Sequence, residues 1–138
     1  MERLSSSPNV IDIYGFCGVT SLIEYSSGGD LGWAIIDKRS SLTQIDKLRI
    51  AYQVSIALAD THKLPIAHTD ITLWQFLLGS NNVYKLNDFN RARWMRIDTA
   101  KKKPCGFKVG MNGGKVRISV VVFLLVQNPH TPILIWCL

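Results

Sequence analysis

The sequence has few cysteines and no apolar run long enough to cross a membrane, and each absence excludes a class of protein. Cys17, Cys105 and Cys137 are odd in number and lack C-x-x-C spacing, which argues against a disulfide scaffold and a zinc site. The 3 histidines also lack metal-ligand spacing. The amino-terminal segment has no basic start followed by an apolar block, so no secretory signal is visible. We therefore expect a cytoplasmic protein without a membrane span.

Basic residues outnumber acidic ones, with 16 Lys and Arg against 10 Asp and Glu in 138 residues. Hydrophobic residues make up 47% of the chain, which is enough to build a core and excludes disorder throughout. Arg91, Arg93, Arg96 and Lys101–Lys103 form a basic stretch that could bind nucleic acid or membrane phosphates. The alternative is a solvated loop. We favour the loop, because Trp94 is too little aromatic content for base stacking.

The amino-terminal part predicts two short strands and a short helix. Val10–Tyr14 partly alternates apolar and polar residues, so we expect a strand there with a turn at Gly15–Gly18. Thr20–Tyr25 predicts a second strand. Asp30 is a suitable N-cap for a helix that runs through Asp37.

The clearest predicted helix spans Gln44–His62. Thr43 or Ser41 could cap its start, and Pro65 prevents its continuation. Apolar residues recur at helical spacing, which predicts one buried face. That face would contain Ile45, Leu48, Ala51, Tyr52, Ser55, Leu58 and Ala59.

Three short β-type runs follow, at Ile66–His68, Phe76–Leu78 and Val83–Leu86, with the last two joined by a hairpin turn. Asp70 follows the first run and Asp88 follows the third. The hairpin can bring both carboxylates to one edge. Such a pair suits Mg²⁺ binding and acceptance of a proton from a hydroxyl, although aspartates after strands are also common as solvated turn residues.

The residues around both carboxylates are similar to motifs of a known family. His68–Leu78 contains His68, Asp70 and Gln75 at the spacing of the protein kinase catalytic loop, H-R-D-L-x-x-x-N, followed by an apolar strand. Leu86–Asn90 resembles the strand that leads into the D-F-G motif.

Upstream segments resemble other parts of a protein kinase in the same order. Ser7–Val10 is similar to the H-P-N-I/V segment before the fourth strand, and Leu22–Tyr25 with Gly28–Leu31 is similar to the fifth strand, the hinge and the next helix. The helix that ends at His62 matches the αE helix. The resemblance covers Leu4–Phe107.

This resemblance implies roles for individual residues. Asp70 matches the catalytic Asp that accepts the proton of the substrate hydroxyl, and Thr72 stands at the position of the catalytic-loop Lys. Gln75 and Asp88 match the two residues that bind Mg²⁺.

The resemblance likewise implies an ATP site. Ile23 falls at the gatekeeper position, and the backbone of Glu24 and Ser26 would meet adenine through the hinge.

Four positions depart from the family pattern. Thr69 replaces Arg and Thr72 replaces Lys, so positive charge is missing beside the reacting phosphate. Gln75 is one methylene longer than Asn, which shifts the geometry of a metal site. Asn90 replaces Gly, and Asn is the next most tolerant residue for positive φ. Each change weakens phosphoryl transfer without abolishing the site.

The sequence contains no G-x-G-x-x-G loop, no V-A-I-K-like Lys and no A-P-E-like segment. The resemblance therefore implies an α+β, protein kinase-like fold with the hinge region plus the first part of the C-lobe, lacking most of the N-lobe and the later C-lobe helices. The implied parent activity is ATP-dependent phosphoryl transfer to a protein hydroxyl, which we expect to be impaired or absent in this chain. The alternative is a pseudokinase-type protein-interaction module without catalysis.

We divide the chain into residues 1–107, a partial protein kinase-like domain, and residues 108–138, an activation-segment remnant with a non-family apolar tail. Val120–Val126 and Pro132–Leu138 are uncharged runs that favour aggregation. The codons for Val116 and Arg117 can begin like a splice donor. The tail is therefore either the translation of an unspliced intron or a frameshift, or a genuine lineage-specific strand and tail.

Overall fold

The computed structural model describes residues 4, 6–38 and 41–105, and the predicted apolar tail lies outside them. Two α-helices and four two-stranded antiparallel sheets make up about half of this part of the chain, which confirms the predicted α+β class. The elements are β1 (Ile13–Cys17), β2 (Thr20–Ile23), α1 (Leu31–Lys38), α2 (Gln44–His62), β3 (Ile66–Ala67), η2 (Leu73–Gln75), β4 (Phe76–Leu78), β5 (Tyr84–Leu86), η3 (Phe89–Arg91), β6 (Arg93–Trp94), β7 (Ile97–Asp98) and β8 (Lys103–Pro104).

Helix α2 begins with a reciprocal cap. The Thr43 hydroxyl accepts a hydrogen bond from the Asp46 amide at 3.1 Å, and the Asp46 carboxylate accepts one from the Thr43 amide at 3.0 Å. At the other end the Lys63 amide still donates to the Ala59 carbonyl at 3.2 Å, and Pro65 follows. The predicted bounds of this helix are confirmed.

The predicted buried face of α2 was wrong at most of its positions. Ile45, Leu48 and Tyr52 are 69%, 60% and 68% exposed. The buried side chains lie on a neighbouring stripe, which packs on β5, and they are Ile50, Ala51, Val54, Ala57 and Thr61. Both stripes have helical spacing, so the contact with the strand and not the periodicity decides which one is covered.

Hairpin β1–β2 starts later than the sequence predicts. Val10 and Ile11 are buried beside β5, where Val10 forms an isolated parallel bridge with Leu86 and the Ile11 amide donates to the Leu86 carbonyl at 3.0 Å. Strand β1 therefore begins at Ile13, and its turn lies at Gly18, whose φ of 59° favours glycine.

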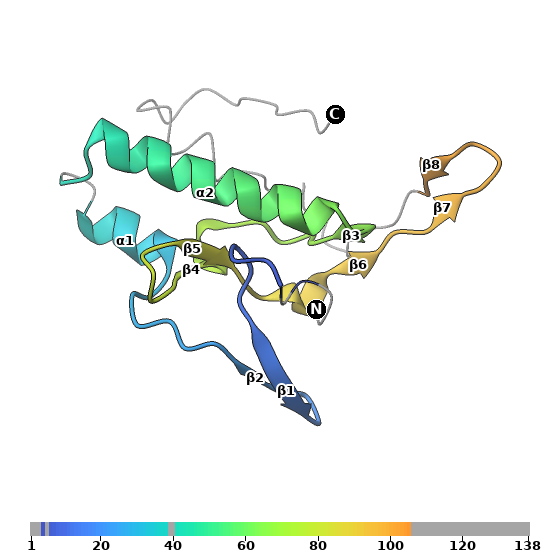
Figure 1. Ribbon diagram of the computed structural model, residues 1–138, viewed down its shortest axis with the longest axis horizontal. Helices are drawn as coiled ribbons and strands as arrows, with labels where there is room; N and C mark the ends of the chain where they lie inside the picture. Colours follow the sequence, from blue (N-terminus) through green and yellow to red (C-terminus); the bar gives the residue numbers. More distant parts are fainter. Residues whose placement is uncertain (1–3, 5, 39–40, 106–138) are drawn as a thin grey trace.

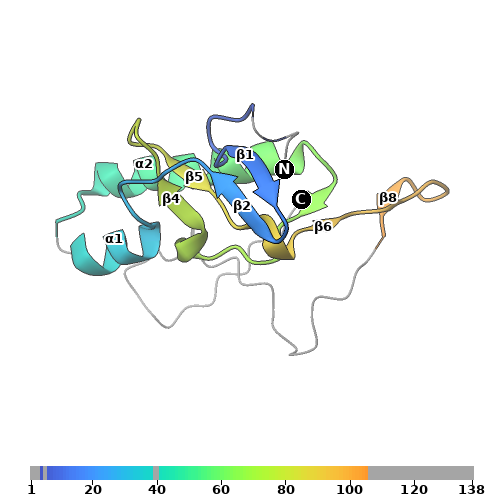
Figure 2. The same ribbon diagram turned by 90° about the horizontal axis from the view of Figure 1, so that it is seen from below.

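Hairpin β4–β5 is where the sequence predicts it. Phe76 faces Leu86, and the Gly79 amide closes the turn on the Val83 carbonyl at 2.9 Å. Both strands enter the main core beneath α2, together with Leu31 of α1. Figure 1 shows α2 lying along this hairpin, with β1–β2 extending away from it. Hairpin β7–β8 lies apart from the other elements, on the side opposite α1, in both views (Figures 1 and 2).

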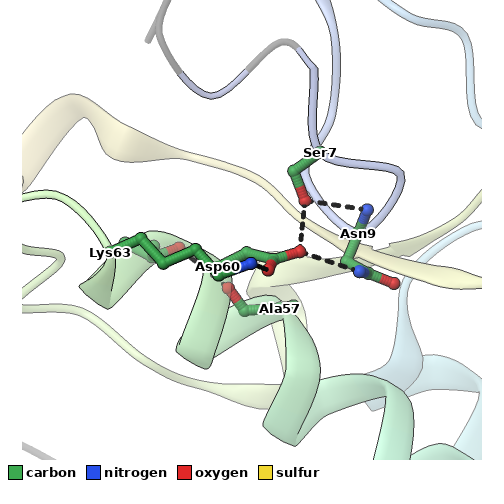
Figure 3. Close-up of polar contacts among 6 residues, drawn as sticks. Ser7, Asn9, Ala57, Asp60 and Lys63 are labelled. Carbon is green, nitrogen blue, oxygen red and sulfur yellow. Dashed lines mark hydrogen bonds and ion pairs between the residues drawn. The ribbon is translucent and has the colours of Figure 1, made fainter.

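A polar cluster attaches the amino-terminal segment to the end of α2 (Figure 3). The Ser7 hydroxyl and the Asn9 side-chain amide both donate to one oxygen of Asp60, at 2.6 and 2.9 Å. Lys63 Nζ lies 2.6 Å from the other oxygen. These bonds hold the segment that contains Val10, which packs with Leu4 and with Ile66 of β3 in a second, small core.

Candidate active site

Asp70 lies between β3 and η2, and its two carboxylate oxygens differ in their surroundings. Gln75 Nε2 donates to Asp70 Oδ2 at 3.4 Å, and Arg91 Nη1 lies 3.6 Å from the same oxygen. Within the described residues Oδ1 has no hydrogen bond or ion pair. The carboxylate is therefore oriented through one oxygen, while the other is open to accept a proton.

His68 joins the Asp70 segment to the Asp88 segment. It is 3% exposed, its Nε2 lies 2.9 Å from the Asn87 carbonyl, and its ring meets Phe89 edge to face with centroids 4.7 Å apart. Burial lowers the pKa of His68, while the Asn87 carbonyl and the charges of Asp88 and Asp70 oppose that shift. The ring is thus a neutral packed group that lies close to both carboxylates.

Asp88 begins η3 in a left-handed conformation, with φ 58° and ψ 62°. Its carboxylate makes no hydrogen bond or ion pair within the described part of the chain. The Asn87 amide donates to the Gln75 carbonyl at 2.8 Å, which keeps the Asp88 segment beside η2.

The donor set of this region suits a hard cation. Asp88 offers a free carboxylate, and Gln75 retains its side-chain oxygen because its bond to Asp70 uses Nε2. One or two protein oxygens, completed by water and phosphate, are typical of Mg²⁺ sites. In residues 4, 6–38 and 41–105 no three His, Cys, Asp or Glu side chains gather as a metal cluster.

Thr72 precedes η2, and its hydroxyl is buried without a hydrogen-bond partner among the residues that the structure describes. A buried hydroxyl without a partner is unfavourable, and it brings no charge to the site. The structure therefore offers no cation at this position.

The residues predicted to bind adenine lie at the end of β2 and directly after it. Ile23 is half-buried and pairs with Ile13, the Glu24 amide donates to the Asp12 carbonyl at 2.9 Å, and the Ser26 hydroxyl donates to the Leu78 carbonyl at 2.7 Å. The Glu24 carbonyl and the Ser26 amide make no hydrogen bond to any described residue. This segment is thus fixed to β4, and two of its backbone groups have no partner in the described part of the chain.

A buried ion pair at Glu24, in the predicted hinge, was missed by the sequence analysis. Lys85 Nζ lies 2.9 and 2.7 Å from the two carboxylate oxygens of Glu24, and the side chains are only 10% and 15% exposed. Lys85 stands between Tyr84 and Leu86 in a strand that is buried at every position. A single charged residue in such a strand is the signal that could have revealed the pair.

Arg91 was predicted only as part of a solvated basic stretch, and the structure places its guanidinium beside Asp70. The Thr69 hydroxyl donates to the Arg91 carbonyl at 2.8 Å. Thr69 reaches it from a left-handed backbone with φ 66°, which is unfavourable for a β-branched residue. Arg93 and Arg96 are exposed, as predicted for a solvated stretch.

Comparison with known proteins agrees with these motifs. The family model for protein tyrosine and serine/threonine kinases matches residues 1–110. The chain belongs to this protein kinase family. A probable serine/threonine-protein kinase of Dictyostelium discoideum is 33% identical over 109 residues, which are 75% of this chain and 12% of that protein. An ankyrin repeat and protein kinase domain-containing protein of Mus musculus is 30% identical over 106 residues, 74% of this chain and 14% of that protein.

Aurora kinase A-B of Xenopus laevis is 33% identical to this kinase-family chain over 89 residues, which are 59% of the chain and 21% of that protein. The chain thus spans between a tenth and a quarter of the length of these relatives. Neither helix in the described residues combines the length and the apolar character needed to cross a membrane.

Proposed function

We propose that this chain forms the hinge and the first part of the C-lobe of a protein kinase-type phosphotransferase. The observation that carries this proposal is the Asp70 carboxylate, which accepts a hydrogen bond from Gln75 at Oδ2 and has no partner at Oδ1 among the described residues. A general base needs this combination of fixed orientation and a free acceptor.

The proposed reaction transfers the γ-phosphoryl group of ATP to a protein hydroxyl. The hydroxyl O–H bond breaks and its proton passes to Asp70 Oδ1. A new O–P bond forms as the bond between the γ-phosphorus and the bridging oxygen breaks, and ADP departs. Asp88 and Gln75 would hold Mg²⁺, which when bound neutralises charge on the phosphates.

The proposed adenine contacts are the Glu24 carbonyl as acceptor and the Ser26 amide as donor, with Ile23 beside the ring. Support comes from the absence of other hydrogen-bond partners for these two groups among the described residues. The Ser26 bond to Leu78 and the Glu24 bond to Lys85 hold the segment in place without using those groups.

We propose that phosphoryl transfer by this chain is slow, because Thr69 and Thr72 carry no charge. We also propose a cytoplasmic location. The second candidate is a pseudokinase-type interaction module that binds a protein partner without catalysis. The buried hydroxyl of Thr72 favours it, since it contributes no charge for a transferring phosphate.

Thermal unfolding of the full chain with Mg²⁺ and ATP tests the proposal. Nucleotide should raise the midpoint temperature, Asp88→Ala should remove that shift, and Asp37→Ala on the exposed end of α1 should retain it. Radiolabel transfer to a protein substrate should be lost in Asp70→Asn while the thermal shift persists. No shift at millimolar nucleotide would overturn the phosphotransferase proposal and favour the interaction module.

A further inference from the structure

The candidate site lacks positive charge within its own loop, and Arg91 from the next segment supplies some. Thr69 and Thr72 are uncharged neighbours of Asp70 in the chain. Arg91 forms the ion pair of Asp70 among the described residues, with Nη1 3.6 Å from Oδ2. A guanidinium thus lies beside the oxygen that is not open to a substrate.

The backbone of Arg91 is held by hydrogen bonds, whereas its side chain is largely exposed. The Thr69 hydroxyl donates to the Arg91 carbonyl at 2.8 Å, and the Ala92 amide closes η3 on the Phe89 carbonyl at 3.0 Å. The Arg91 side chain is 57% exposed. It therefore projects from a fixed point with its head group in solvent.

The guanidinium has unused donors. It carries five N–H groups, and a single contact of 3.6 Å to Asp70 leaves most of them open. Exposed ion pairs of this kind are weak, so Arg91 can leave Asp70 for a stronger acceptor at little cost. Phosphate is such an acceptor, because its oxygens match the planar fork of a guanidinium in a bidentate pair.

We propose that Arg91 binds the terminal phosphate of the bound nucleotide and provides the positive charge that Thr72 does not. This inference rests on the proposed function, since it needs a nucleotide at the hinge and at Asp88. The open oxygen of Asp70 and the free donors of Arg91 would then face the hydroxyl and the phosphate, respectively.

The test compares the affinities of the full chain for Mg²⁺–ATP and Mg²⁺–ADP at constant ionic strength, by calorimetric titration. Arg91→Gln should lower the affinity for ATP by about tenfold or more relative to that for ADP, which is the loss of one charge-assisted contact. Arg91→Lys should retain part of the preference for ATP. Arg93→Gln, an exposed arginine two positions along, is the matched control and should change neither affinity.

Two other outcomes separate the two proposals. If the unmodified chain binds both nucleotides and Arg91→Gln leaves their ratio unchanged, the role of Arg91 is wrong while the proposed function stands. If the unmodified chain binds neither nucleotide, the proposed function fails, and the role of Arg91 fails with it.

Discussion

Asp60 shows how one carboxylate joins two distant segments. Bonds from Lys63, Ser7 and Asn9, in that order of strength, lower the pKa of Asp60 from 3.8 to about 2. The Asp60 side chain is 13% exposed, whereas that of Lys63 is 75% exposed, so solvent weakens the largest of these contributions. The charged form of Asp60 is favoured in the folded chain, and its protonation works against folding.

The pKa of Asp60 predicts a pH dependence of stability. Because the folded pKa is depressed, the contribution is fully present above about pH 4 and is lost as the pH falls toward 2. We expect a loss of about 1–2 kcal/mol after allowance for solvent. Urea unfolding from pH 6 to pH 2 measures it. Asp60→Asn should flatten this part of the curve, and Asp37→Asn, exposed on α1, should not.

The ion pair between Glu24 and Lys85 predicts an asymmetric response to substitution. Glu24→Gln leaves a buried ammonium without a counter-charge, so the free energy of unfolding should fall by about 3–5 kcal/mol. The double variant Glu24→Gln with Lys85→Met should regain much of this loss, because the charge itself is gone. Chemical unfolding of the single and double variants gives the comparison. Equal stability of the two variants would contradict the importance of the pair.

At the scale of elements, α2 depends on its amino-terminal cap. Thr43→Ala removes the hydroxyl that accepts a hydrogen bond from the Asp46 amide, and it should lower the free energy of unfolding by about 1 kcal/mol. Thr43→Ser keeps the hydroxyl and should be nearly neutral. Urea midpoints of both variants, with far-ultraviolet circular dichroism as the signal, measure the effect. A loss of the same size in both would point to the methyl group and not to the cap.

The bounds of α2 could be predicted because they are set locally. Thr43 and Asp46 form the cap within one turn, and Pro65 ends the helix whatever packs on it. The buried face could not be predicted in the same way. Ile45 and Ile50 belong to different apolar stripes, and only the position of β5 determines that Ile50 is covered.

The candidate site, too, could be predicted only where its residues lie in local motifs. Asp70 and Asp88 could be singled out as candidates because their motifs are short and lie next to strands. The contact of Arg91 could not, since Asp70 is distant in sequence and Arg91 could equally be solvated. For Lys85 the apolar strand around it indicates burial, but it does not indicate that the partner is Glu24. Contacts of this kind depend on how β4 and β5 bring the segments together.

For the molecule as a whole, many large apolar side chains face solvent. Tyr14, Phe16 and Leu22 on hairpin β1–β2 are 65%, 64% and 66% exposed. The apolar side chains Ile45, Leu48 and Tyr52 of α2 are exposed to a similar extent. A two-stranded hairpin has little stability of its own. The part of the chain that the structure describes therefore buries a modest core relative to its surface.

This arrangement predicts marginal stability for the isolated chain. We expect a broad thermal transition below the range of about 45–65 °C that is usual for mesophilic domains, with a van't Hoff enthalpy that differs from the calorimetric one. Differential scanning calorimetry provides both quantities. A single cooperative transition at high temperature would contradict the prediction.

The left-handed Thr69 has a consequence for how this chain can change. A β-branched residue with φ 66° costs about 1–3 kcal/mol, and glycine would remove that strain. Glycine would also remove the hydroxyl that holds the Arg91 carbonyl. Glycine would thus relieve the backbone strain and at the same time release the backbone from which the guanidinium beside Asp70 projects. At position 69, the stability of the backbone and the placement of the Arg91 charge therefore favour different residues.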